Sequence, residues 1–276
     1  MTVINTNVNA LQATNASNRA ANMTSQAMTR LSTGTRINSA ADDAAGLAIS
    51  TSMTSQINGM NQGIKNANDG ISLAQTAQGS LTEVTNMMQR VRELSVQSAS
   101  GTYQDTDRED MQQEVNSLKT QITSILGDTK FNGNALFNTT GAGSAATTSF
   151  SIQAGANTTD TITLTSQGID WDAQKANIDV TSSGSASATI DKMDTLIRQV
   201  STAAASFGAG QSQLQAAVNN LTNNSTNLSA ARSRIQDTDY SAESTAMAKA
   251  QILSQASTAM IAQANQSQQN VLSLLK

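Results

Sequence analysis

Histidine, cysteine and proline are all absent from this chain of 276 residues. Without His and Cys, the side chains that most often act as general base, nucleophile or soft metal ligand are missing, and disulfides and thiolate metal sites are excluded. At an ordinary usage of about 5%, roughly fourteen prolines are expected. Because an interior Pro costs a helix about 3 kcal/mol, their absence favours long, uninterrupted helices. We therefore expect a mainly helical protein that is not an enzyme and holds no cofactor or metal.

Aromatic residues and charge are also scarce, and this limits the possible partners. Aromatic residues make up only 3% of the chain, which fits a thin bundle better than a thick globular core. The net charge of −4 and the lack of a strongly basic stretch argue against nucleic-acid binding. No apolar run approaches the ~20 residues that span a bilayer, so we expect no membrane partner. The first seven residues lack a basic n-region and an apolar h-region, which predicts no cleavable secretory signal.

The strongest positive pattern is a heptad repeat that runs from residue 190 to residue 235. Such a stripe needs a facing helix, because water cannot satisfy an apolar seam. Its positions follow alternating steps of three and four: Ile190, Met193, Ile197, Val200, Ala204, Phe207, Gln211, Leu214, Val218, Leu221, Ser225, Leu228, Arg232 and Ile235.

A long helix is predicted over residues 44–99, and a shorter helix over 106–126. The long helix has its own seam: Ile57, Met60, Ile64, Ala67, Ile71, Ala74, Ala77, Leu81, Val84, Met88, Val91 and Leu94. Four glycines inside it cost roughly 1 kcal/mol each against Ala, which tertiary packing must offset: Gly59, Gly63, Gly70 and Gly79. Ser39–Asp42 and Thr106–Glu109 have the capping-box pattern, so each is expected to begin one of these helices.

The middle of the chain has a different pattern. Residues 128–187 are rich in Gly, Ser, Thr and Asn, and apolar residues alternate in Ser149–Gln153 and Asp160–Thr165, which predicts short strands and hairpins. The helices on either side form an approximate palindrome, so the 190–235 helix should pack antiparallel on the 44–99 helix. The predicted fold is mainly α: a long antiparallel helical coiled-coil bundle with paired terminal helices and a small β-hairpin region in the middle.

Charged clusters in the chain suggest helix starts and surface pairs rather than chemistry. Asp42 and Asp43 are adjacent, so their side chains diverge by about 100° on a helix, and capping explains them better than paired catalysis. The run 105–110 superficially resembles a calcium loop, but its sixth position holds Asp110 where the sharp turn needs Gly. Arg90 and Glu114 should form a surface pair of under about 1 kcal/mol if the shorter helix packs antiparallel on the longer one.

The helices at the two chain ends, over 1–35 and 241–276, have weak apolar stripes and no partner in the predicted bundle. Such helices are marginal in isolation. They are either disordered tails or they order against copies of the chain, and the apolar end at 271–275 favours assembly. The candidate self-assembly residues are Val3, Ile4, Val8, Leu11, Leu31, Ile252, Leu253, Met260, Ile261, Val271, Leu272 and Leu275.

Five segments closely resemble bacterial flagellin: Ile4–Leu11, Leu31–Ile49, Gln89–Gln97, Ala231–Tyr240 and Ala262–Leu275. The resemblance covers roughly residues 1–138 and 188–276. It implies a structural subunit that self-assembles into the extracellular flagellar filament for motility. The chain departs from the family in its short middle and in Ser267-Gln268, where many members have Val-Pro.

The resemblance also implies a division of the chain into five parts. Residues 1–43 would be the N-terminal inner-tube helix and connecting segment, and 44–138 the N-terminal part of a helical shell domain. Residues 139–187 would be a short β-hairpin or variable outer region. The C-terminal long helix of the shell would occupy 188–236, and the C-terminal inner-tube helix 237–276.

The partners implied by the family are further copies of the chain, an export chaperone on the C-terminal helix, filament cap and junction proteins, and host flagellin receptors. Export in an unfolded state would account for the missing signal peptide. By position, Gln89, Arg90, Leu94 and Glu114 match the surface read by the cell-surface receptor. The apolar end, with Val271, Leu272 and Leu275, matches the part read by a cytosolic sensor. An alternative function is a hook–filament junction or cap-type helical protein of the same organelle.

Overall fold

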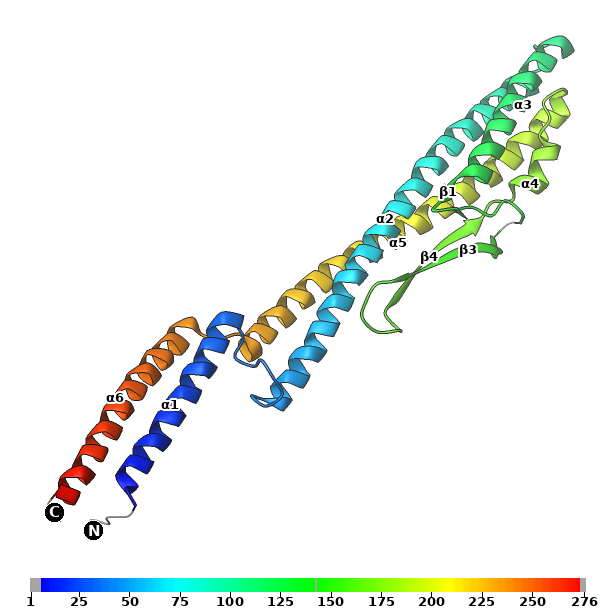
Figure 1. The fold of residues 1–276 in the computed structure, drawn as a ribbon. Helices are drawn as coiled ribbons and strands as arrows, with labels where there is room; N and C mark the ends of the chain where they lie inside the picture. The colour runs from blue at the N-terminus through cyan, green and yellow to red at the C-terminus, as the bar shows by residue number, and fades with distance from the viewer. Residues whose placement is uncertain (1–5, 142, 274–276) are drawn as a thin grey trace. The chain divides into compact units, whose positions relative to one another are not determined.

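Long helices dominate the computed structural model, which describes residues 6–141 and 143–273 (Figure 1). The helices are α1 (Val8–Thr33), α2 (Ala44–Ala99), α3 (Asp105–Asp128), α4 (Trp171–Gln174), α5 (Ser183–Gln236) and α6 (Tyr240–Ser273), with a 3-10 turn at Lys175–Asn177. The strands are β1 (Lys130–Phe131), β2 (Asn134–Ala135), β3 (Gly143–Gln153) and β4 (Thr161–Gly168). The strands form two antiparallel hairpins, β1 with β2 and β3 with β4. The predicted mainly α fold with a central hairpin is confirmed, and the short α4 was not predicted.

Contacts divide the described residues into two compact units. The bundle unit runs from Gln56 to Thr226, and the terminal unit holds the residues up to Ser55 and those from Asn227 onwards. Helices α2 and α5 each contribute to both units. The five-part division of the chain inferred from the resemblance stays a prediction.

In the bundle unit, α2 and α5 run antiparallel. Arg92 Nε donates to Asp194 Oδ1 at 2.6 Å, and Ser225 Oγ donates to Asn61 Oδ1 at 3.2 Å. Residue numbers thus fall along α5 as they rise along α2. The facing helix that the heptad repeat requires is α2 of the same chain, as predicted.

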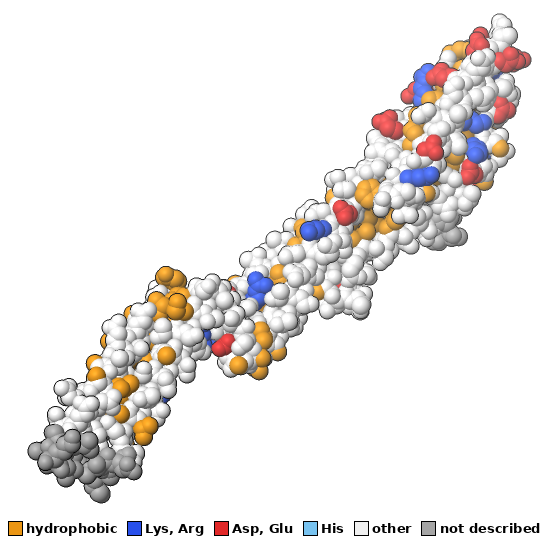
Figure 2. Space-filling model, in the orientation of Figure 1, with side chains coloured by type: hydrophobic (Ala, Val, Ile, Leu, Met, Phe, Trp, Pro, Cys, Tyr) orange, Lys and Arg blue, Asp and Glu red, His pale blue; other side chains and the backbone are white. Residues whose placement is uncertain are grey.

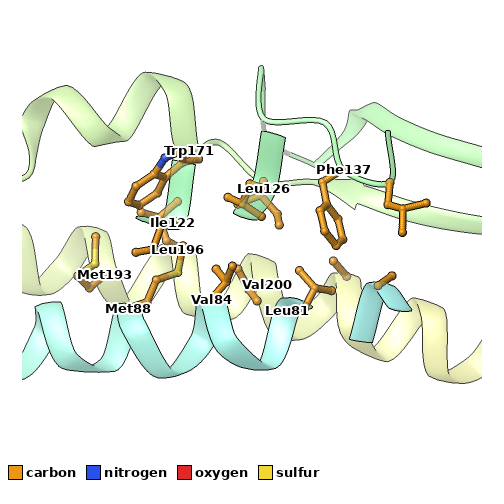
Figure 3. Packing of buried hydrophobic residues seen from close by; sticks show 14 of the residues in the cluster. Leu81, Val84, Met88, Ile122, Leu126, Phe137, Trp171, Met193, Leu196 and Val200 are labelled. Atoms are coloured by element: carbon orange, nitrogen blue, oxygen red, sulfur yellow. The ribbon is translucent and has the colours of Figure 1, made fainter. Parts of the chain in front are cut away.

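The buried stripe of α5 is wider than a two-helix seam. Four predicted positions are fully buried: Met193, Val200, Phe207 and Leu214. The other four predicted positions before Leu214 are half-buried: Ile190, Ile197, Ala204 and Gln211. In each case the residue one position earlier is buried instead: Thr189, Leu196, Ala203 and Gly210. The reason is a second neighbour, because side chains of α2, α3 and α5 meet in one layer (Figure 3).

Aromatic residues attach the chain's middle to this bundle. The single Trp of the chain, Trp171 in α4, is fully buried, and its Nε1 donates to Thr123 Oγ1 of α3 at 2.8 Å. The ring of Phe137 meets that of Phe207 edge-on, with centroids 6.4 Å apart. Three aromatic rings therefore fill places in the core that composition alone would assign to aliphatic residues.

Glycines of α2 make room for the β3–β4 hairpin. A Cβ at Gly63 would lie 2.8 Å from the backbone carbon of Ala154, and one at Gly59 would lie 2.6 Å from Ala156 Cβ. Gly79, by contrast, has nothing within 4 Å of such a Cβ. Close packing of the hairpin loop thus offsets the cost of Gly59 and Gly63 to the helix. Nothing in the structure explains Gly79.

The start of α2 is shifted from the predicted capping box. Asp43 Oδ1 accepts the backbone N–H of Gly46 at 2.9 Å and caps the helix. Asp42 Oδ2 instead accepts the backbone N–H groups of Ser39 and Asn38 in the preceding turn. These bonds, that of Ser39 foremost, hold the pKa of the Asp42 carboxyl below its ordinary value.

The start of α3 corrects the second capping prediction. Asp107 Oδ2 accepts the backbone N–H of Gln104 at 3.0 Å, and the helix begins at Asp105. The box predicted at Thr106–Glu109 is therefore wrong by two residues.

The end of α2 is closed by Arg108 of α3, a residue that the sequence did not single out. Its guanidinium is buried and donates to the carbonyl oxygens of Ser98, Ser100 and Tyr103 at 3.0, 2.9 and 2.8 Å. The last carbonyls of a helix have no partner within it, so this one side chain supplies donors that backbone geometry leaves missing.

The two breaks in the chain lie together in the terminal unit. Gly34 ends α1 in a left-handed conformation, with φ of 71°. Its carbonyl accepts the N–H of Thr238, and the Arg36 N–H donates to Gln236 O. Backbone hydrogen bonds thus join the segment between α1 and α2 to the segment between α5 and α6.

Two glycine substitutions in α2 should have opposite effects on stability. Gly63→Ala forces a methyl group against backbone that cannot move aside, so we expect about 1–3 kcal/mol of destabilisation. Gly79→Ala meets open space and should stabilise the helix by up to ~1 kcal/mol. Urea unfolding of both variants measures the difference, and equal shifts of the same sign would contradict this packing.

Candidate functional site

Helices α1 and α6 pair antiparallel through small residues. Asn7 Nδ2 donates to the Ala264 carbonyl at 3.0 Å near one end, and Arg30 Nη1 lies 3.7 Å from Glu243 Oε1 near the other. The buried positions repeat every seven residues: Ala20 and Ala27 in α1, and Ala250, Ser257 and Ala264 in α6. A heptad seam of this kind lets two helices approach closely but buries little apolar area.

Of the seven side chains predicted for self-assembly that the structure describes, five are exposed and lie outside the buried seam. Among them, the exposed fractions range from 42% at Leu253 to 65% at Ile252. The others with exposed side chains are Val8, Leu11 and Met260. Leu31 and Ile261 are half-buried. Val3, Ile4 and Leu275 lie outside the described residues, as do the side chains of Val271 and Leu272.

Two grooves run along the helix pair. The first is lined by Asn9, Gln12, Ala13, Ala16, Leu253, Ala256, Ser257, Met260, Gln263, Ala264 and Ser267. The second is lined by Ala21, Thr24, Ser25, Met28, Thr29, Gln251, Ser254 and Gln255. At about 100° per residue, the two sets come from opposite sides of the seam on each helix. The helix pair is therefore grooved on two sides.

Charged side chains are scarce on these two helices. Their only charged residues are Arg19 and Arg30 in α1 and Glu243 and Lys249 in α6. On the visible face, Lys, Arg, Asp and Glu gather over the bundle unit instead, and hydrophobic patches lie over α1 and α6 (Figure 2). Depletion of charge around apolar side chains is typical of the buried centre of a protein interface.

The second candidate surface lies where α2 meets α3. Arg90 Nε donates to Glu114 Oε1 at 2.8 Å, so the predicted pair is confirmed. Gln89, Arg90 and Glu114 are exposed, but Leu94 is 2% exposed and belongs to the core. Placing Leu94 on this surface was therefore wrong. The heptad seam of α2 already contained it, and a seam position faces inward.

A second arginine on α2 has a similar environment on another face. Arg92 binds Asp194 of α5, and both arginine side chains are nearly half exposed. The hydrogen bond to Glu114 raises the pKa of Arg90, and the bond to Asp194 raises the pKa of Arg92 and lowers that of Asp194. Ion pairs this exposed contribute little to the free energy of folding, because solvent screens them.

Other kinds of site find no support in the part of the chain that the structure describes. Among residues 6–141 and 143–273, no three Asp or Glu side chains gather in a way that could hold a metal ion. None of the helices described combines the length and apolar character needed to cross a membrane.

Comparison with known proteins gives a consistent result along nearly the whole chain. Residues 4–142 match the family described as bacterial flagellin N-terminal helical region, and residues 190–275 match its C-terminal counterpart. The flagellin of Halalkalibacterium halodurans is 40% identical, covering 99% of this chain and 100% of that protein. The flagellin of Bacillus subtilis is 41% identical, covering 99% of each.

Similarity of fold extends to a more distant solved structure. A structure described as a flagellar hook-associated protein of Vibrio parahaemolyticus matches with a TM-score of 0.58 and 17% sequence identity. The match covers 71% of this chain and 100% of the Vibrio parahaemolyticus chain. At this identity the likeness concerns the fold alone.

The small-residue seam should not tolerate a larger side chain. Ala20→Leu would push α1 and α6 apart, at a cost of about 1–3 kcal/mol. Ala21→Leu makes the same change at the next residue, where the side chain is exposed in the subunit. We expect faster amide hydrogen exchange throughout α1 and α6 in the first variant only. Equal exchange in the two variants would mean that the helices are not held by this seam.

Proposed function

Because this chain belongs to the bacterial flagellin family, we propose that the outer faces of α1 and α6 are the surfaces through which its copies polymerise. The chain is a structural subunit of the flagellar filament, an extracellular appendage, and not an enzyme. The hook–filament junction or cap-type alternative is not favoured.

The observation that carries this proposal is the inverted arrangement of the helix pair. Small residues occupy its interior, while Leu253, Met260 and Ile252 are exposed to solvent. Burying such a side chain contributes about 1.5–3 kcal/mol, which the isolated subunit forgoes. A second copy of the chain would recover this free energy, because association would bury the apolar side chains that are exposed in the isolated subunit. The grooves on two sides of the seam further support contact with more than one neighbour.

A polar side chain at position 260 should weaken polymerisation without unfolding the subunit. Met260→Gln keeps the length of the side chain but places an amide in the first groove, where burial without a partner costs about 1–3 kcal/mol. We expect the critical concentration for seeded polymerisation to rise by about 5–100-fold, since 1.4 kcal/mol is a factor of ten. Turbidity and electron microscopy of seeded protein measure it.

The matched control for this experiment is Met260→Leu, which remains apolar at similar volume. Its critical concentration should lie much nearer to that of the unmodified chain. Circular dichroism should give the same melting curve for all three proteins, because residue 260 is 61% exposed in the subunit. If Met260→Gln polymerised as readily as Met260→Leu, this face would not be the polymerisation surface.

We further propose that Gln89, Arg90 and Glu114 form the surface read by the host cell-surface flagellin receptor. They are exposed and lie together where α2 meets α3, and the Arg90–Glu114 pair fixes the orientation of the guanidinium. Arg is over-represented among residues that dominate binding energy at interfaces.

Arg90→Ala should reduce receptor signalling by about tenfold or more, the usual loss at a central interface arginine. Arg92→Ala is the matched control, because Arg92 has similar exposure and an ion pair of its own but lies about 200° away around the helix. A reporter cell line that expresses the receptor measures both variants as purified subunits. Undiminished signalling from Arg90→Ala would sink the assignment.

The remaining partners follow from the same family. We propose that an export chaperone binds α6 and covers Leu253 and Met260 before assembly, which would keep exposed apolar side chains from premature polymerisation. Filament cap and junction proteins would contact the same terminal helices at the two ends of the polymer. Export would proceed without a cleavable signal peptide. In the host, the apolar end at 271–275 would be the part read by the cytosolic flagellin sensor.

A further inference from the structure

Methionine is the only sulfur-containing residue of this chain, which has 11 Met and no Cys. Peroxides oxidise its thioether to a sulfoxide, and the susceptible residues are the accessible ones. The methionines differ widely in this respect. Met23, Met28 and Met260 are 44%, 58% and 61% exposed, whereas Met88 and Met193 are fully buried in the bundle unit. Among the methionines that the structure describes, those with the largest exposure are therefore on α1 and α6.

Two of these methionines line the grooves of the helix pair. Met260 lies in the first groove beside Leu253, and Met28 lies in the second. Oxidation converts a flexible apolar side chain into a polar one and disrupts interfaces that contain it. Each groove thus contains a side chain whose polarity one chemical step can change.

We propose that Met28 and Met260 are oxidation sites that convert the unassembled subunit into a form that cannot polymerise. The proposal rests on the polymerisation surface inferred above. A hydroperoxide transfers one oxygen atom to the sulfur, forming an S–O bond as its own O–O bond breaks. The thioether loses two electrons, and the peroxide is reduced to water or an alcohol. The sulfoxide oxygen would then have to be buried against apolar side chains of the next copy.

Assembly should also protect these sites, because the next copy would cover both grooves. The oxidant-sensitive state is therefore the free subunit. Methionine sulfoxide reductases reverse the modification, so the change need not be permanent.

The first test treats the full-length purified subunit with hydrogen peroxide and maps sulfoxides by peptide mass spectrometry. We expect Met28 and Met260 to oxidise at least ~10-fold faster than Met88 and Met193, because oxidation follows exposure. Seeded elongation of the oxidised protein should fall at least ~5-fold, and sulfoxide reductase should restore it. Subunits oxidised after polymerisation should carry less sulfoxide at both sites.

The second test uses variants, with each treated protein compared with its own untreated elongation rate. The double variant Met28→Leu, Met260→Leu should keep most of its own rate after peroxide treatment. Met23→Leu is the matched control, because Met23 is exposed on α1 but lines neither of these grooves. That variant should remain as sensitive as the unmodified chain.

Three outcomes would overturn the proposal: equal oxidation of exposed and buried methionines, full elongation by protein with sulfoxide at both sites, or equal loss in the double variant and the unmodified chain. The first and third outcomes leave the polymerisation surface untouched, whereas the second also requires the test of that surface. Failure of that surface is detected separately, with unoxidised Met260→Gln, so the two hypotheses can be distinguished.

Discussion

The pairing of the first half of the chain with the second, in antiparallel register, is the constraint on which the rest of the structure depends. In the bundle unit it aligns Arg92 with Asp194 and Asn61 with Ser225. In the terminal unit the same order brings Thr54 to Arg232 and Asn7 to Ala264. The residues between the two halves supply the third helix and the hairpins, and their aromatic anchors close the core only because α2 and α5 already lie together.

The two units use the same heptad geometry with different side chains. In the bundle unit, large residues such as Phe207 and Leu214 fill the seam, so most of the hydrophobic stabilisation is internal. In the terminal unit, Ala and Ser fill it, and the large residues are left outside. The bundle unit therefore buries its large apolar side chains within a single chain, while the terminal unit leaves several of them exposed. The two units therefore differ in where large side chains lie around the helices: inside the seam in the bundle unit and outside it in the terminal unit.

Sequence patterns were sufficient to predict the helices, the hairpin and the antiparallel pairing, because long heptad repeats without Pro allow few alternatives. They failed where tertiary context decides. Thr106–Glu109 and the observed Gln104–Asp107 are both plausible caps, and Leu94 was assigned to a surface although its heptad position faces inward. No sequence pattern predicts the role of Arg108, because its hydrogen-bond partners are backbone carbonyl groups that only the turn between α2 and α3 brings within reach. The small-residue seam has a seven-residue spacing in the sequence, at Ala20, Ala27, Ala250, Ser257 and Ala264. Ala and Ser are so frequent in these helices that this spacing does not stand out from the sequence alone.

The hydrogen bond between Asn7 and Ala264 spans 257 positions in the sequence. A ribosome therefore produces α6 long after it has produced α1. A prematurely terminated chain, or one cut near its C-terminal end, would contain α1 but not its counterpart, and neither groove would be complete. Only molecules that contain both helices can therefore present both walls of each groove.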